Sequence, residues 1–460
     1  MILTKPNANH LCMALALLIG VSSNLATAQF ASAIIREGDS ASRGTVDSIN
    51  GTAVNHAGGY AVTANLAGAG STISTVFGNA TGGSGSFLRF EDTIGDLSQT
   101  SFESFVGISN AGQIAYSAST DNIATGQTAL DSVWLDDALL QNEEDAVAAA
   151  PGEFSSFNSR PGITAGGTPY WVGGLTDTAG GTTVDRGLFF DGNLLLRGND
   201  DVGVAEPVAV GSGISFSYRF SALGTNYISP INVQSPTTND QLVAINGTVV
   251  SIGGRSLREG IRVPATVGGA GIENWDNFDF VSINEAGDYF VTGDTDGTFV
   301  RDEFVLINGR TVLREGDLID GSRVDGAIEG GMMNEDRDWA MVWDISDLDG
   351  SNSREALIVN GEVVLVEGDQ VDWNNDGFVD LADDGFTITD FFGISSLSLS
   401  DRDTNGDVTV YFTADATNTG GTELEAALQV TLSTIPEPEG GLLALFALGS
   451  IAIFRRRYLP

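Results

Sequence analysis

The sequence predicts an all-β repeat protein, most simply a seven-bladed β-propeller with four-stranded blades. Three observations predict this fold. β-rich segments are joined by tight Asn-Gly or Asp-Gly turns, and these turns recur with a period near 55 residues. The two ends of residues 29–434, which we call the body, carry matching halves of one hairpin. Helix patterns are nearly absent between residues 29 and 434. Tandem β-sandwiches or a β-solenoid remain alternatives, because alternating strands alone do not distinguish these architectures.

The repeat is defined by its turns. A two-residue type I′ turn needs positive φ at both central positions, which Asn, Asp and Gly tolerate best. The clearest copies are Asn308-Gly309 and Asn360-Gly361, and the remaining ones become progressively fainter towards the N-terminus. The turn positions are Asn79, Asp136, Asp191, Asn246, Asn308 and Asn360, separated by 57, 55, 55, 62 and 52 residues. Such a period is close to that of propeller blades.

A second strand pair precedes each hairpin, for example residues 105–108 with residues 113–116, so that each unit has four strands. Residues 33–39 match the second half of a hairpin, and residues 423–430 resemble a first half. Pairing of these two segments closes a ring and removes exposed sheet edges, which otherwise promote aggregation. Six internal hairpins and this composite one predict seven blades.

The composition is strongly acidic, with 61 Asp and Glu against 21 Lys and Arg, and the only lysine is Lys5. If the ends are cleaved near Ala28 and Pro438, the body keeps about 60 acids and 17 arginines, a net charge of roughly −43. Such a surface repels nucleic acid and anionic lipid. Hydrophobic residues make up 42 % of the chain, which is enough to form packed cores.

Few catalytic strategies remain open to such a body. It lacks lysine and cysteine, since Cys12 precedes the expected cleavage site, and it contains one histidine, His56. We interpret His56 as a surface turn residue and assign no catalytic residue. Paired carboxylates are the main chemistry left.

The N-terminus has the features of a secretory signal peptide. Residues 1–28 contain the basic Lys5, an apolar stretch from Leu11 to Val21, and the small residues Ala26 and Ala28 of a cleavage site. A retained membrane anchor needs about 18 or more apolar residues. We therefore expect signal peptidase to release a mature chain that begins near Gln29.

The C-terminus combines three features in order within residues 435–460. Pro436-Glu437-Pro438 is followed by the apolar run 441–454 and by three arginines, Arg455, Arg456 and Arg457. This arrangement resembles the PEP-CTERM sorting signal of Gram-negative bacteria, which implies processing by an exosortase and delivery to the envelope or extracellular polymer. The arginines hold the short apolar helix transiently at the inner membrane with its basic end in the cytoplasm.

One stretch matches the calcium-loop pattern D-x-[DN]-x-[DN]-G with an acid at position 12, in residues 372–383. The expected ligands are Asp372, Asn374, Asp376, the carbonyl of Phe378, Asp380 and Asp383. The segment resembles the loops of dockerin modules, but a single loop does not imply docking to a cohesin. We expect one structural calcium ion in an insertion between blades.

Weaker acidic loops occur at residues 294–297, 347–350 and 401–407. The last has ligand spacing only in its first half. The repeated Glu-Gly-Asp, as at residues 315–317, is interpreted as a polar turn at a strand end.

These features predict an exported, exosortase-sorted protein of the cell surface or extracellular matrix with a non-enzymatic role in binding polysaccharide or surface components. The alternative is a carbohydrate-active hydrolase or lyase with paired carboxylates in a central aromatic-lined pocket. A third hypothesis is a passive coat protein whose repeat is itself the function. The propeller architecture alone does not choose among them.

Overall fold

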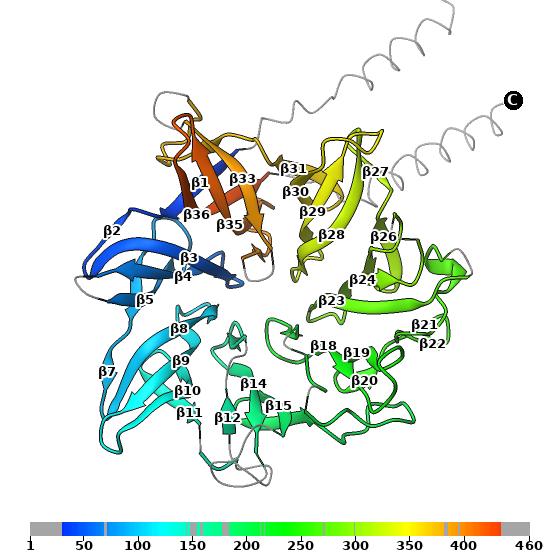
Figure 1. Cartoon of the computed structure of the whole chain (residues 1–460), viewed down its shortest axis with the longest axis horizontal. Coiled ribbons are helices and arrows are strands. Elements are labelled where there is room, and N and C mark those ends of the chain that lie inside the picture. Colours follow the sequence, from blue (N-terminus) through cyan, green and yellow to red (C-terminus); the bar gives the residue numbers. More distant parts are fainter. Residues whose placement is uncertain are drawn as a thin grey trace, which may run out of the picture.

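The computed structural model of the chain describes residues 30–433, apart from residues 69–70, 144, 148–153, 157–159, 177–183, 212, 216, 270–271, 299, 381–384 and 394–395. Seven sheets of four or more strands surround a central axis (Figure 1). The predicted seven-bladed propeller is confirmed, and the sandwich and solenoid alternatives are wrong. The described residues contain one helical element, the 3-10 turn η1 (Ala265–Val267), and none of their helices is long and apolar enough to cross a membrane.

Blades 1 to 3 follow one another along the chain. Blade 1 contains β2 (Ser40–Ala41), β3 (Gly44–Val54), β4 (Tyr60–Ala67), β5 (Thr72–Asn79) and β6 (Ser86–Phe90). Blade 2 contains β7 (Thr93–Ile94), β8 (Leu97–Ile108), β9 (Ile114–Asn122), β10 (Gln127–Leu135) and β11 (Ala138–Asn142). Blade 3 contains β12 (Phe154–Ser156), β13 (Gly162–Ile163), β14 (Pro169–Leu175), β15 (Asp185–Phe190) and β16 (Asn193–Arg197).

Blades 4 to 6 continue the ring. Blade 4 contains β17 (Arg219–Phe220), β18 (Tyr227–Asn232), β19 (Gln241–Ile245) and β20 (Thr248–Val249), followed by the small hairpin of β21 (Ser251–Ile252) and β22 (Arg255–Ser256). Blade 5 contains β23 (Trp275–Ile283), β24 (Tyr289–Thr295), β25 (Phe304–Ile307) and β26 (Arg310–Arg314). Blade 6 contains β27 (Leu318–Ile319), β28 (Ser322–Met333), β29 (Trp339–Ser346), β30 (Arg354–Val359) and β31 (Glu362–Val366).

Blade 7 joins the two ends of the body. It contains β33 (Phe386–Phe392), β34 (Ser398–Leu399), β35 (Val408–Asn418), β36 (Glu423–Leu432), β1 (Ala31–Arg36) and β32 (Val371–Asp372). The first strand, β1, pairs antiparallel with the last, β36, between Ser32↔Gln429 and Arg36↔Ala426 (Figure 1). The predicted ring closure is confirmed. Because every blade and the closing pair lie within residues 30–433, the predicted body 29–434 is the segment proposed for experiments.

The hairpin turns explain the Asn-Gly signal. At Asp191, Asn246, Asn308 and Asn360 the first turn residue has a φ of 50–51°, and the glycine after it has a φ of 71–83°. The Asn308 side chain accepts the backbone N–H of Tyr289 at 3.0 Å and donates to Asp288 at 2.7 Å. It therefore fixes the turn to the neighbouring strand of its blade.

The two faintest turns depart from this pattern. Asp136 and Asp137 form a two-residue connection between β10 and β11, but of the two only Asp136 has positive φ, at 52°. The prediction of a tight turn at Asn79 is wrong. This residue ends β5, and residues 80–85 form a longer loop before β6, with positive φ at Gly82 and Gly83.

Seven clusters of buried apolar side chains hold the ring together, one between each pair of neighbouring blades. Between blades 7 and 1, for example, Ile35 and Tyr411 pack with Ile49 and Tyr60. Apolar burial is the main stabilising contribution to such packing. Each blade therefore packs its described apolar residues against two neighbours.

Candidate functional site

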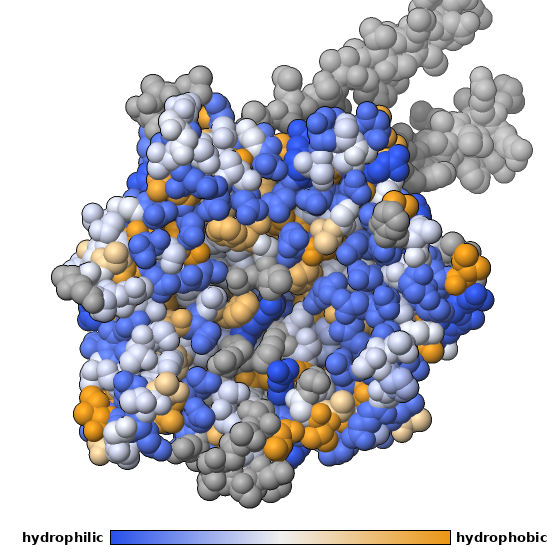
Figure 2. All heavy atoms as spheres, viewed as in Figure 1, coloured by the Kyte–Doolittle hydropathy of each residue, from blue (hydrophilic) through white to orange (hydrophobic). Residues whose placement is uncertain are grey.

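A cavity of about 150 Å³ lies on the axis of the ring, and the innermost strand of every blade or a segment next to it lines the cavity. Figure 2 shows one face of the ring, where hydrophilic and hydrophobic residues both lie around the centre. The lining segments are residues 52–56, 105–108, 160–163, 219–220, 282–283, 332–335 and 397–401, the last without residue 400. Concave sites of this kind are where propellers and other rings can hold a ligand.

One wall of the cavity, from blades 6, 7 and 1, is acidic. His56 lies in the turn after β3, as predicted, but that turn faces the cavity, and its Nδ1 lies 2.7 Å from Oδ2 of Asp401. Burial alone lowers the pKa of His56, but the hydrogen bond and charge of Asp401, with the charges of Glu335 and Glu285, raise it above its ordinary value. Asp401 thus stabilises the charged form of His56.

The two carboxylates of this wall already have hydrogen-bond partners. Glu335 accepts the backbone N–H of Ala222 through Oε1 and that of Glu285 through Oε2, both at 2.7 Å. Asp401 accepts the N–H of Glu335 at 2.9 Å through the oxygen that does not face His56. These contacts link blades 1, 4, 5, 6 and 7, so that the acids connect neighbouring blades.

The opposite wall, from blades 2 to 4, is basic and aromatic. The Arg160 guanidinium lies over the ring of Phe105, 4.3 Å from its centroid, and Arg219 lies directly before Phe220 in β17. Tyr170 packs against Phe220 with ring centroids 4.4 Å apart and the ring planes tilted by 31°. All five residues line the cavity. The cavity therefore has a cationic, aromatic side and an anionic side.

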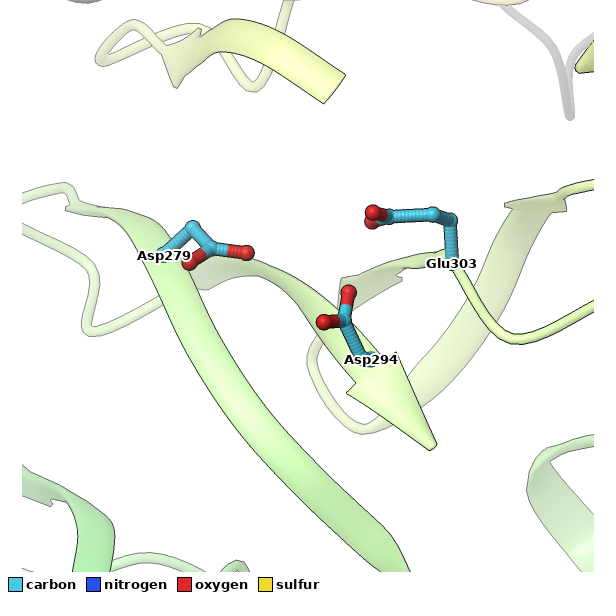
Figure 3. Close-up of side chains that lie close together, drawn as sticks. All are labelled: Asp279, Asp294 and Glu303. Carbon is cyan, nitrogen blue, oxygen red and sulfur yellow. The ribbon is translucent and has the colours of Figure 1, made fainter. Parts of the chain in front are cut away.

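A second polar group lies within blade 5, outside the central cavity. Asp279 on β23, Asp294 on β24 and Glu303, directly before β25, point towards one another (Figure 3). Each contributes an oxygen to a set whose members lie within 4.8 Å of one another. Oδ1 of Asp294 and Oε2 of Glu303 are buried without a hydrogen-bond partner. Such a cluster either keeps protons or takes a cation of the hard type that prefers oxygen ligands.

Glu303 departs from the role that other blades give to its position. Five residues before the turn, Gln241 and Glu355 accept the N–H of Phe278 and Phe391 in the next blade, at 2.6 and 2.7 Å. Glu303 occupies the same position before Asn308 but faces two aspartates. Burial, followed by the charge of Asp294, raises its pKa strongly, and burial raises the pKa of Asp279 to about 6.

These shifts predict a specific pH dependence. Because the three acids bind protons more tightly in the folded than in the unfolded chain, their stabilising contribution is present below about pH 4 and is lost as pH rises through the raised pKa values. Glu303→Gln is therefore expected to raise the free energy of unfolding at pH 8 by about 1–3 kcal/mol and to do little at pH 4. Urea unfolding across pH 4–8 measures this, with the exposed Glu362→Gln as control. An equal response in both variants would contradict it.

The predicted calcium loop starts at the ring closure. Asp372 ends β32, which pairs in parallel with β1, and its fully buried carboxylate accepts the N–H groups of Asp376 and Gly377 at 3.1 and 2.9 Å. Asp376 in turn accepts the N–H of Phe378 at 3.0 Å. Asp383 lies outside the described residues, as do the signal segment with Ala26 and Ala28 and the sorting segment 435–460. Calcium binding here stays a prediction.

A charge-removing, shape-preserving variant tests that prediction best. Asp372 is unsuitable, because its loss removes two backbone hydrogen bonds with or without calcium. In the wild type, calcium at about 100 times its dissociation constant is expected to raise the free energy of unfolding by about 2.7 kcal/mol over chelator. Asp376→Asn with Asp380→Asn should abolish that difference in unfolding experiments. Asp403→Asn with Asp407→Asn, a matched change in another acidic loop, should keep it.

Two outcomes of that experiment redirect the assignment. No calcium effect on the wild type would contradict the loop. A calcium effect that persists in the loop variant but disappears in Glu303→Gln would place the ion at the carboxylates of blade 5.

The Glu-Gly-Asp turn at residues 315–317 and Asp403 of the third acidic loop have structural roles. Asp317 of the Glu-Gly-Asp turn accepts the N–H of Arg314 at 3.1 Å, and Glu315 accepts that of Asp302 at 3.0 Å. In the third acidic loop, Oδ1 of Asp403 accepts the N–H groups of Asn405 and Asp407 at 2.7 and 2.9 Å. These carboxylates stabilise turns in the way that Asx motifs do.

Comparisons with known proteins add little beyond this geometry. No protein-family model and no curated protein sequence matches the chain. Solved structures that resemble it include a eukaryotic initiation factor, with 14 % identity, a TM-score of 0.34, and coverage of 87 % of this chain and 84 % of the other. A neuraminidase-like protein of influenza A/flat-faced bat/Peru/033/2010 (H18N11) has 10 % identity, a TM-score of 0.32, and coverages of 90 % and 97 %.

An α-L-arabinanase of Penicillium chrysogenum, solved with arabinobiose, has 9 % identity, a TM-score of 0.28, and coverages of 87 % and 97 %. At such identities and scores none of these likenesses carries an argument about activity. The propeller assignment rests on the strand pairing of the chain itself.

Proposed function

We propose that this protein is an exported, ring-shaped surface module that binds extracellular polysaccharide or another surface component in its central cavity without chemically altering it. One observation carries the choice between binding and catalysis. Both carboxylates of the cavity, Glu335 and Asp401, already connect neighbouring blades through their hydrogen bonds. The aromatic and cationic wall opposite them is the surface left for a ligand.

The hydrolase or lyase alternative needs a carboxylic acid and a carboxylate that face a substrate, separated by about 5–10 Å. Glu335 has no oxygen without a backbone partner, and moving it would break the contacts of blade 6 with blades 4 and 5. The three acids of blade 5 lie close together, but none of them lines the central cavity. The geometry therefore favours binding over glycoside cleavage.

Export and sorting belong to the same proposal. The signal segment 1–28 and the sorting segment 435–460 would direct the chain through signal peptidase and an exosortase, with transient anchoring in the inner membrane. The acidic body and a structural calcium ion in loop 372–383 suit an environment outside the cell. Replacing Pro436, Glu437 and Pro438 together by alanine is expected to leave the protein membrane-bound and unprocessed in a bacterium that has an exosortase, as fractionation would show.

The binding experiment uses residues 29–434 and gel-immobilised neutral and acidic polysaccharides. Phe105→Ala, which removes an aromatic face from the cavity, is expected to weaken polymer binding about tenfold or more, as loss of a central aromatic contact does. Phe378→Ala, at an exposed aromatic outside the cavity, should bind like the wild type. Unchanged binding by Phe105→Ala would contradict the cavity as the site.

The same samples separate the competing functions. Release of new sugar ends from the polymer would support the enzyme and contradict a binding role. Absence of any polymer binding would favour the passive coat.

A further inference from the structure

Two arginines in the central cavity are without carboxylate partners in the described part of the chain. Arg160 precedes β13 in blade 3, and Arg219 begins β17 in blade 4. Both are half-buried and line the cavity. Neither forms an ion pair with a described acid, although most other half-buried or buried arginines do. Those paired arginines are Arg36, Arg89, Arg197, Arg258, Arg314 and Arg402.

This lack of partners is unexpected in so acidic a chain. With 61 acids against 21 basic residues, most half-buried arginines of the described chain pair with a carboxylate, and Arg323 is another exception. The charge that affects Arg160 most is the like charge of Arg219. Burial, with this repulsion as the next cause, lowers the pKa of Arg160 to about 10, so that it remains protonated at neutral pH. A bound anion would offset both the desolvation cost of the buried guanidinium group and its repulsion by the other arginine.

The two guanidinium groups keep hydrogen-bond donors for such an anion. Arg219 donates from Nη1 to the carbonyl of Tyr218 at 3.1 Å, and Arg160 stacks over Phe105 at 4.3 Å. A guanidinium has five N–H donors in a planar fork that matches carboxylate and sulfate oxygens. Tyr218 also donates its hydroxyl to the carbonyl of Arg160, which ties the two arginine-bearing segments together. This contact orders the two backbone segments that carry the arginines.

We propose that Arg160 and Arg219 bind the carboxylate or sulfate group of an acidic sugar, with Phe105, Tyr170 and Phe220 bordering the sugar ring. This assignment rests on the proposed function and names its ligand as an acidic polysaccharide. The opposite wall, with Glu335 and Asp401, then faces the neutral hydroxyl groups of the same sugar. A polymer without acidic groups leaves the two arginines unpaired.

The size of the cavity and the charge of the body limit how such a polymer binds. A volume of about 150 Å³ is smaller than the ~300–1,000 Å³ of sites for drug-sized molecules, so it accommodates one sugar residue or a chain end. The acidic exterior repels an anionic polymer, but at 0.1 M salt this repulsion is screened beyond about 10 Å. Contacts inside the cavity are screened much less. Binding is therefore expected to persist at physiological salt.

Isothermal titration calorimetry on residues 29–434 tests the assignment with four probes. These are oligogalacturonate as the carboxylated ligand, a heparin oligosaccharide as the sulfated ligand, a neutral maltooligosaccharide, and sodium sulfate. The wild type is expected to bind at least one acidic oligosaccharide tenfold or more tightly than the neutral one. Arg160→Gln with Arg219→Gln should remove that preference. Arg255→Gln with Arg310→Gln, the same charge change at two exposed arginines, should retain it.

A folding control keeps the result interpretable. Because the double variant removes repulsion between like charges, its thermal unfolding midpoint should not fall below that of the wild type. If it does fall, Arg219→Lys provides a second variant, which keeps the charge but not the fork and should retain part of the preference.

The outcomes separate this inference from the proposed function. Equal binding of acidic and neutral oligosaccharides would overturn the arginine assignment and leave polysaccharide binding standing. Sulfate binding that depends on the two arginines, without binding of any oligosaccharide, would support the anion site and contradict the polysaccharide function. Equal loss of preference in both double variants would overturn the inference, because it would show attraction by overall charge.

Discussion

Ile35→Asp is expected to open the ring and to lower the free energy of unfolding by more than about 4 kcal/mol, because it buries a carboxylate in an apolar contact. Ile35 lies on β1, is 2 % exposed, and packs in the cluster between blades 7 and 1. It stands opposite Ala427 of β36, in the strand pair that joins the ends of the body. Urea unfolding gives the loss, and limited proteolysis within residues 30–39 reports the release of β1.

The matched control lies on β36, the strand that pairs with β1. Thr431→Asp introduces the same charge at an exposed residue that pairs with Thr409, and it is expected to cost about 1 kcal/mol or less. If Ile35→Asp were no worse than this control, closure through β1 would not stabilise the ring.

Arg314→Gln is expected to destabilise the protein by about 3–5 kcal/mol, because it leaves Glu273 buried without its counter-charge. The two residues form a bidentate pair, with distances of 2.9 and 2.6 Å, and their side chains are 4 % and 6 % exposed. Arg314 also donates to the carbonyl of Arg301 at 2.8 Å and to Thr295 at 3.2 Å. It thus ties the last strand of blade 5 to three other segments, and its loss leaves several acceptors unpaired.

An exposed ion pair supplies the comparison. Arg43 and Asp92 lie 3.7 Å apart with side chains 42 % and 64 % exposed, so Arg43→Gln is expected to cost at most about 1 kcal/mol. Unfolding midpoints in urea for the two variants check the difference. Similar losses for both would mean that burial does not determine the cost.

The fold could be predicted because its signals are local. Asn-Gly pairs specify tight turns through their own backbone preferences, and the spacing of such turns counts the blades. Closure could be predicted because residues 33–39 repeat the pattern of residues 311–317 without the strand before it. The prediction of a tight turn at Asn79 was wrong, because no Gly follows Asn79 and a lone Asn does not fix a two-residue loop.

The candidate site could be predicted only in part, because it is formed by residues far apart in the sequence. His56 was placed correctly in a turn, but nothing local shows that Asp401, more than 300 residues later, faces it. Arg160 and Arg219 lie in segments where the repeat is faintest and were not recognised. One available signal was that they lie just before or at the start of the innermost strands of consecutive blades. For the acids of blade 5, the available signal was the position of Glu303 five residues before the turn. Glu355 occupies the same position in blade 6, and only alignment of the repeats shows this.

The sequence could not distinguish free from engaged carboxylates. With 61 acids, close pairs arise readily, and only hydrogen-bond geometry shows that Glu335 and Asp401 connect neighbouring blades. This distinction is the reason why we propose binding rather than glycoside cleavage.

The most direct test of the account is a crystal structure of residues 29–434 with a bound acidic oligosaccharide such as oligogalacturonate. The account predicts density for one sugar in the central cavity, with its carboxylate between Arg160 and Arg219 and its ring beside Phe105. Density for the sugar at the outer edge of the blades or at the acids of blade 5, with the central cavity filled by solvent alone, would contradict it.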